Sequence, residues 1–191
     1  MGRRWFGAEG CDMEFVDGQD GRAEEIVGLF EATFTASEGA EEGRLIGRLV
    51  AGLLATTPPG ELFVFSAREA GALIGCILFT RLHFPQDAPK VVLLSPVAVA
   101  PDRQGQGVGQ ALLGHGLARM AETGAEVAVT YGDPGYYARV GFRPVTVEAV
   151  APPHPLSQPE GWLAQGLTGA PLGQLTGPSR CAPAFDDPSY W

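Results

Sequence analysis

The chain has 191 residues, enough for one domain of ordinary size with a buried core and a short extension. Apolar residues make up 45% and charged residues 18%, a globular composition that excludes intrinsic disorder for most of the chain. The formal charge of −9 argues against general binding to nucleic acid or to anionic membranes, and no apolar run is long enough to span a bilayer.

Cysteine usage favours a reducing compartment. Cys11, Cys76 and Cys181 are widely spaced and form no CxxC pair, so neither a disulfide scaffold nor a zinc site is expected. The three histidines also lie singly, and the sequence therefore predicts no bound metal. Arg3 and Arg4 are followed by no apolar segment of the kind that a secretory signal needs. We expect a cytoplasmic protein.

The N-terminal part of the chain predicts one strand and two helices. A short β-prone run at 13–16 is followed by a helical pattern that Asp20 can cap and that extends to about Phe34. A second set of apolar residues with helical spacing covers 41–54, and a Pro-Pro-Gly segment ends it. Both helices precede the main sheet.

Three β-prone segments come next. Residues 62–67 and 72–83 are joined by Arg68-Glu69-Ala70-Gly71, a short connection that is typical of an antiparallel hairpin. The nearly unbroken apolar run 90–99 indicates a central strand that is covered on both faces. Pro96 lacks a backbone N–H, so we expect the sheet to open locally around it.

A strand–helix–strand unit follows the central strand. A glycine-rich turn at 104–109 opens a helix to about Thr123, and a strand is expected at 126–131. The two flanking strands should be parallel, and the crossover between them should be right-handed.

A short helix and a proline-rich tail complete the chain. Asp133 suits the N-cap of a helix that ends at Gly141, and a last strand is expected over 142–147. Half of the 16 prolines lie beyond position 151, so we expect an irregular tail that is draped over the domain. These elements predict an α/β fold with one mixed sheet over residues 1–150, on which an extension, 151–191, packs.

The most informative stretch is 97–109, where an apolar strand leads through a glycine-rich loop into a helix N-terminus. Backbone N–H groups at such a junction lack intrahelical partners, and glycines let phosphate oxygens approach them closely. A tight turn whose glycines serve packing is the alternative. A Walker A loop is excluded because Lys90 is the only lysine, and a dinucleotide fingerprint fails because Gln110 or Leu112 would occupy its last glycine position.

Two motifs resemble those of one enzyme superfamily. Gln104, Gly107 and Gly109 form a Gln-x-x-Gly-x-Gly pattern directly after the apolar strand, and this pattern resembles the phosphate loop of the GNAT superfamily of N-acetyltransferases. The segment 136–142, Tyr-Tyr-Ala-Arg-Val-Gly-Phe, is similar to the Tyr-x-x-x-Gly-Phe ending of the same superfamily.

Further segments resemble the YhbS-like branch of these acetyltransferases. They are Leu94-Ser95-Pro96-Val97-Ala98-Val99, residues 132–137, and the ending Pro183-Ala184-Phe185-Asp186. The resemblance in organisation covers residues 12–150. It implies N-terminal helices, an antiparallel hairpin, and a parallel β-α-β unit whose central strands splay apart.

The resemblance implies that acetyl-coenzyme A is the cosubstrate and that the loop holds its pyrophosphate. The main chain of Val97 and Val99 is expected to pair with the pantetheine arm. Arg103 either faces solvent or assists the 3′-phosphate. The expected cofactor-binding residues are Val97, Val99, Arg103, Gln104, Gly105, Gln106, Gly107, Val108 and Gly109.

Tyr137 occupies the family position of the general acid, four residues before Gly141. An unperturbed phenol has a pKa of about 10, near that of an alkyl thiol, so proton transfer to a thiolate would be nearly matched. The neighbouring Tyr136 is the alternative, because only one of the pair can point into a given cleft. The N–H of Val97 is a candidate oxyanion donor.

The sequence assigns no general base. Many relatives resembling this chain place a glutamate on the central strand, but residues 91–100 contain no carboxylate or histidine. Ser95 could position a water, and Glu38, Glu41 or Glu42 could face the acceptor, although most surface glutamates are simply solvated.

The leading prediction is an N-acetyltransferase that moves an acetyl group to an amine of a small molecule or peptide, by direct attack in a ternary complex. The first alternative is a non-catalytic module that senses acyl-coenzyme A, and a remoter one is a structural domain without ligand. No nucleic acid or membrane partner is expected, and a homodimer is left open.

Overall fold

The computed structural model describes residues 4–6, 12–19, 21–85, 90–175 and 177–191. The strands follow the order β1-β2-β3-β4-β5-β6-β8-β7 in one sheet, in agreement with the predicted mixed α/β fold. Two compact units share the chain: residues up to 78 with 96–116, and residues 79–95 with 117–191. Within the described ranges, no helix is long and apolar enough to cross a membrane.

The first unit begins with antiparallel strands. β1 (Arg4–Phe6) pairs with β2 (Asp12–Asp17), and β2 pairs with β3 (Leu62–Glu69). β3 is joined to β4 (Ala72–Leu82) by Ala70 and Gly71, whose φ values of 49° and 83° are those of a tight hairpin turn. The predicted hairpin is therefore present, but Arg68 and Glu69 belong to strand β3 and not to its turn.

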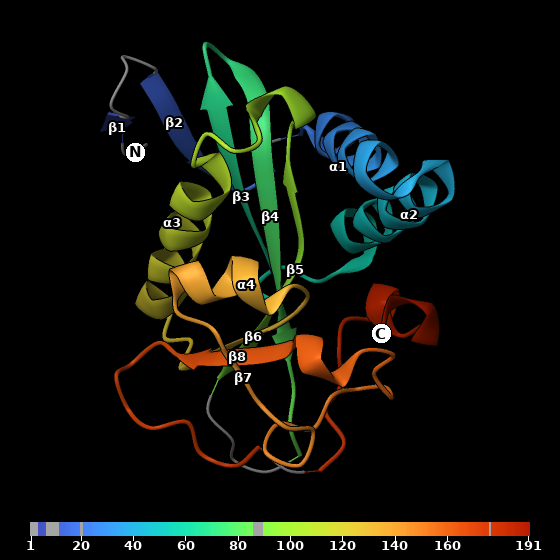
Figure 1. The fold of residues 1–191 in the computed structure, drawn as a ribbon, viewed down its shortest axis with the longest axis vertical. Coiled ribbons are helices and arrows are strands. Elements are labelled where there is room, and N and C mark those ends of the chain that lie inside the picture. Colours follow the sequence, from blue (N-terminus) through green and yellow to red (C-terminus); the bar gives the residue numbers. More distant parts are fainter. Residues whose placement is uncertain (1–3, 7–11, 20, 86–89, 176) are drawn as a thin grey trace. The chain divides into compact units, whose positions relative to one another are not determined.

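The two predicted helices pack side by side (Figure 1). They are α1 (Ala23–Glu38) and α2 (Ala40–Thr56), which meet at Gly39 with a φ of 101°. Gly43 marks their close approach, because a Cβ there would come within 2.7 Å of the backbone oxygen of Glu31. The helix starts at Ala23, and the predicted cap, Asp20, lies outside the described residues.

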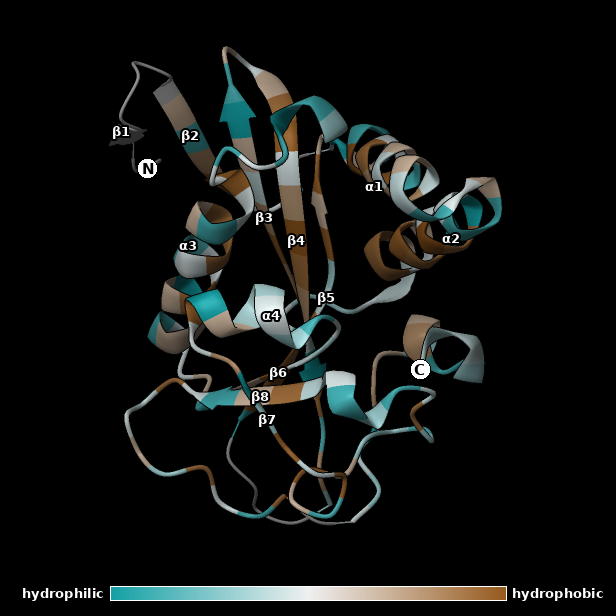
Figure 2. Ribbon diagram, in the orientation of Figure 1, coloured by the Kyte–Doolittle hydropathy of each residue, from teal (hydrophilic) through white to brown (hydrophobic). Residues whose placement is uncertain are grey.

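Apolar side chains of both helices and of the sheet form the core of the first unit. Figure 2 shows apolar residues along β4 and on one side of α2. Phe30, Val50 and Leu53 are fully buried, and burial of each such side chain stabilises the fold by about 1.5–3 kcal/mol.

The glycine loop is held between β5 (Val91–Val99) and α3 (Val108–Glu122). A short 3-10 turn, η1 (Pro101–Arg103), leads into it. A Cβ on Gly75 of β4 would lie 3.3 Å from the side chains of Val108 and Leu112, so the first turns of α3 rest closely on that strand. This packing fixes where the helix N-terminus lies.

The second unit contains the parallel pair that the sequence predicts. β5 pairs with β6 (Val127–Tyr131) from Val91↔Val127 to Leu94↔Thr130. α4 (Pro134–Tyr137) and the 3-10 turn η2 (Ala138–Val140) follow, and Gly141 ends them with a φ of 104°. The side chain of Asp133 accepts a hydrogen bond from the N–H of Gly135 at 2.9 Å, which confirms the predicted cap.

The tail is more regular than the sequence suggests. β8 (Trp162–Gly166) is antiparallel to β6, and β7 (Arg143–Pro144) pairs with β8. The expectation of an irregular tail was therefore wrong for this segment, and the last predicted strand is only two residues long because Pro144 cannot donate to the ladder. Three 3-10 turns complete the tail: η3 (Pro159–Gly161), η4 (Pro183–Phe185) and η5 (Pro188–Tyr190).

Candidate functional site

A row of backbone N–H groups is available in the glycine loop. Among the described residues, none of the N–H groups from 104 to 110 donates to a backbone carbonyl, and the α-helical ladder begins with Ala111 N–H to Gly107 O at 3.0 Å. Gly105 and Gly107 have φ values of 73° and 83°, and a Cβ on either would meet nothing within 4 Å. The loop therefore presents donors and open space to an anion.

The two glutamines of the loop brace it from within. Gln104 Nε2 donates to the carbonyl of Val99 at 3.1 Å, and Gln106 Nε2 donates to the carbonyl of Asp102 at 3.0 Å. Thr33 Oγ1 also donates to the Val99 carbonyl, at 3.3 Å. Because the amide nitrogens of Gln104 and Gln106 are bonded within the loop, we expect these residues to contribute to anion binding through their backbone N–H groups.

The main chain of β5 changes its pairing near Pro96. The register with β6 ends at Leu94↔Thr130, whereas β5 continues to Val99. Ala100 N–H donates to Ile74 O of β4 at 2.9 Å, and by strand alternation Val97 and Val99 point their main-chain groups away from β4. The Val99 carbonyl is already occupied by Gln104 and Thr33, which leaves Val97 as the better-placed residue for an added strand.

Arg103 is engaged by two carboxylates. Its Nε and Nη2 lie 3.1 and 3.0 Å from Glu69 Oε2, and its Nη1 lies 3.0 Å from Asp102 Oδ2. A phosphate at this arginine would therefore compete with partners that the chain itself supplies.

Tyr137 is buried at the end of α4. Its ring packs edge-on against Tyr136 and Phe142, with centroid distances of 5.1 and 5.7 Å. Burial raises the pKa of Tyr137 from 10.0 to about 12, partly offset by a hydrogen bond with Thr130, whose Oγ1 also donates to Leu94 O at 2.9 Å. Burial removes the near match with a thiol pKa that the sequence suggested and keeps the phenol protonated at neutral pH.

The residues considered as candidates for the base differ in their exposure to solvent. Glu38 and Glu41 are exposed, and Ser95 is half-buried. His115 stacks on Phe15 at 4.6 Å and lies 2.9 Å from Asp17 Oδ1, which gives it a structural partner.

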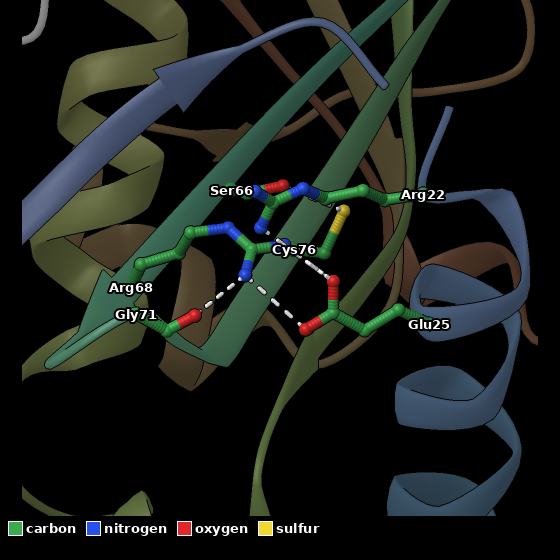
Figure 3. Close-up of polar contacts among 6 residues, drawn as sticks. All are labelled: Arg22, Glu25, Ser66, Arg68, Gly71 and Cys76. Atoms are coloured by element: carbon green, nitrogen blue, oxygen red, sulfur yellow. Dashed lines mark hydrogen bonds and ion pairs between the residues drawn. The ribbon is translucent and has the colours of Figure 1, made fainter. Parts of the chain in front are cut away.

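A second polar cluster, which sequence reasoning missed, lies where β3 meets α1 (Figure 3). The guanidinium of the buried Arg68 donates to both carboxylate oxygens of Glu25, at 3.2 and 2.6 Å, and to Gly71 O at 2.8 Å. A pocket of about 250 Å³ borders it. Cys76, fully buried beside Ser66, has a thiol pKa that burial raises to about 12, as expected of an unreactive core cysteine.

A family profile identifies the protein family of the chain. The profile described as "Acetyltransferase (GNAT) family" matches residues 23–142, which include the glycine loop and the Tyr-x-x-x-Gly-Phe ending. The chain belongs to the GNAT acetyltransferase family. The predicted family is thus confirmed.

Two proteins from Escherichia coli K12 and one from Sanguibacter keddieii are similar in sequence. The uncharacterized N-acetyltransferase YjhQ is 38% identical over 121 residues, 61% of this chain and 66% of its own length. YhbS is 34% identical over 74 residues, 39% and 44% of the two chains. Mycothiol acetyltransferase of Sanguibacter keddieii is 38% identical over 93 residues, 45% of this chain and 29% of that protein. Each match spans less than two thirds of the curated relative.

Solved GNAT structures match nearly the whole chain. A GNAT acetyltransferase of Brucella melitensis, crystallised with acetyl-CoA, superposes with a TM-score of 0.71 at 27% identity, over 91% of this chain and 98% of that one. YhbS of Escherichia coli, crystallised with CoA, has a TM-score of 0.77 at 24% identity and covers 97% of both chains, which supports the fold.

Proposed function

We propose that this GNAT chain is an N-acetyltransferase that moves the acetyl group of acetyl-coenzyme A to an amine of a small molecule or peptide. The row of N–H groups at 104–110 carries the proposal, because it offers a diphosphate several donors and the dipole of α3 at one place. A relative of similar fold crystallised with acetyl-CoA supports the same cosubstrate.

The cofactor-binding residues take distinct roles in this proposal. Gly105 and Gly107 leave room for phosphate oxygens, and the N–H groups of Gln104, Gln106, Val108 and Gly109 add donors. Arg103 completes the predicted phosphate-binding set. Val97 offers main-chain groups on the edge of β5 that faces away from β4, where an amide-bearing arm can add as a strand.

Direct attack in a ternary complex needs an acid but no enzyme nucleophile. A neutral amine attacks the thioester carbonyl, and an N–H such as that of Val97 stabilises the oxyanion. As the intermediate collapses, the C–S bond breaks, Tyr137 gives its proton to the departing thiolate, and the nitrogen loses its extra proton to water. The phenolate of Tyr137 then takes a proton back from solvent. A pKa of about 12 leaves Tyr137 protonated and able to donate. Neither of the two cysteines that the structure describes is suited to a covalent route, because burial raises the thiol pKa of Cys76 to about 12 and that of Cys181 to about 11.

The sensor alternative has no specific observation in its favour. The relatives in sequence are named as acetyltransferases, and the tyrosine that the superfamily uses as an acid has a counterpart here in Tyr137.

The test is release of free coenzyme A thiol. The purified protein is incubated with acetyl-CoA and panels of polyamines, amino acids, aminoglycosides and peptides with free N-termini. Tyr137→Phe should lower turnover by about 10²–10⁴-fold with little change in acetyl-CoA affinity. Tyr136→Phe is the matched control and should keep turnover near that of the unmodified protein. Binding of acetyl-CoA without thiol release on any panel would refute the catalytic proposal and support the sensor.

A further inference from the structure

Three side chains of different ligand types converge in the C-terminal part of the second unit. One ligand atom each of His154, Cys181 and Asp186 lies within 4.8 Å of the other two, and His154 Nε2 is 2.8 Å from Asp186 Oδ1. We propose that these three residues bind a thiophilic divalent cation, with Zn²⁺ as the best fit. Imidazole, thiolate and carboxylate are the ligands that Zn²⁺ takes in proteins, and three of them leave a fourth position for water.

The backbone on both sides of the cluster is fixed before any ion binds. His83 and Arg180 exchange two main-chain hydrogen bonds, of 2.9 and 2.8 Å, and so hold the residue directly before Cys181. Ser179 Oγ donates to Ala151 O at 2.7 Å, and Ala151 N–H donates to Leu175 O at 3.0 Å. The segment that carries His154 is thereby joined to the segment that carries Cys181.

A compact turn brings Asp186 back toward Cys181. The 3-10 turn η4 closes with Asp186 N–H donating to Pro183 O at 3.1 Å. Phe185 is buried beneath it, and Trp191 Nε1 donates to Phe185 O at 2.9 Å. The site therefore has the supported backbone that a metal site needs, with ligands that require only small side-chain movements to meet one ion.

The three side chains can supply an imidazole nitrogen, a sulfur and a carboxylate oxygen to one cation. His154 and Cys181 are half-buried and Asp186 is exposed, so an ion can reach the cluster from solvent. Binding of Zn²⁺ releases the Sγ proton to solvent and forms the S–metal bond. The ion would join the 154 region to the C-terminal turn.

Co²⁺ is the spectroscopic probe for this site. The full chain is reduced, treated with chelator and titrated with Co²⁺. We expect a thiolate-to-metal charge-transfer band and the strong visible bands of four-coordinate Co²⁺, both saturating at one equivalent of the ion. Added Zn²⁺ should abolish both sets of bands. Cys181→Ser should lose the charge-transfer band. Cys76→Ser is the matched control and should keep it. Absence of the band in the reduced chain, or its persistence in Cys181→Ser, would overturn the site.

Carboxylate and imidazole variants test the other two ligands. His154→Ala and Asp186→Asn should each weaken Zn²⁺ binding by at least about 10-fold in a competition titration. Asp187→Asn, in the neighbouring carboxylate, is the control and should bind within a few-fold of the parent. Zn²⁺ should also raise the melting temperature of the parent but not that of Cys181→Ser. A cooperative melting transition of Cys181→Ser in the absence of metal shows that this variant is folded. Equal affinities in all variants would refute the assignment, whatever the acetyl-transfer assay gives.

Discussion

The ring of Tyr137 lies on the main chain of Gly132, so closely that a Cβ on Gly132 would come within 2.9 Å of Tyr137 Cε2. Both residues belong to the second unit, and the ring is held on its other sides by Tyr136 and Phe142. The absence of a side chain at 132 thus sets where the proposed acid can lie.

Gly132→Ala should displace that ring and misplace the phenol. We expect turnover to fall by about 10–100-fold with little change in acetyl-CoA affinity, since a shift of this size affects the proton donor and not the phosphate loop. Gly114→Ala is the control, because a Cβ at Gly114 meets nothing within 4 Å. Steady-state kinetics and circular dichroism of both variants check the result. Unchanged turnover in folded Gly132→Ala would show that Tyr137 is not positioned by this contact.

Gly107→Ala tests the phosphate loop. Alanine is strained at a φ of 83°, and its methyl group would occupy the open space in front of the N–H row. We expect acetyl-CoA to bind about 10–100-fold more weakly by titration calorimetry. Gly114→Ala again serves as the control for an added methyl group in the same region of the chain. Equal affinity of Gly107→Ala and the parent would remove the loop from the proposed site.

The raised pKa of Tyr137 predicts the alkaline side of the pH–rate profile. The protonated phenol is the donor, so activity that depends on it is lost only as pH rises through about 12. Between pH 8 and about 10 the turnover should therefore stay level or rise as more of the amine becomes neutral. A descending limb near pH 10 that disappears in Tyr137→Phe would show that burial does not shield the acid in the working enzyme.

Local sequence signals predicted the parts of the site that are built by neighbours in the chain. The glycine-rich turn before α3, the cap at Asp133 and the helix end at Gly141 depend on residues within a few positions of each other, and all three are present as predicted. Their common cause is main-chain geometry, which short patterns of Gly, Asp and Pro report well.

Long-range pairs were the parts that the sequence could not predict. β8 is a short apolar run between prolines, and its strand identity comes from pairing with β6. The sequence predicts Arg68 as a turn residue, because its partner, the carboxylate of Glu25, lies on a helix far away in the chain. His154 and Cys181 form no local spacing motif, so their proximity becomes visible only once the tail is folded.

The ion pair between Glu25 and Arg68 should make a contribution to stability that is lost in acid. Hydrogen bonds from Arg68 hold the pKa of Glu25 below 4.5, so the contribution is present above pH 4.5 and is lost as pH falls through the lower pKa of the folded state. Glu25→Gln leaves the buried guanidinium of Arg68 without a carboxylate partner and should lower the free energy of unfolding by about 1–3 kcal/mol at pH 7. This is less than the loss at a fully buried pair, because Glu25 is 42% exposed and solvent screens it.

Denaturant unfolding of Glu25→Gln and Glu24→Gln at pH 7 and pH 3 separates this pair from general charge effects. Both glutamates lie in the first turn of α1, so both variants lose the same favourable interaction with the helix dipole. Glu24 is exposed, and its variant should unfold within about 0.5 kcal/mol of the parent at both pH values. The deficit of Glu25→Gln should be smaller at pH 3 than at pH 7, because the contribution of the carboxylate declines as pH falls below 4.5. A deficit that is equal at both pH values would mean that packing, and not the Arg68 ion pair, accounts for the role of Glu25.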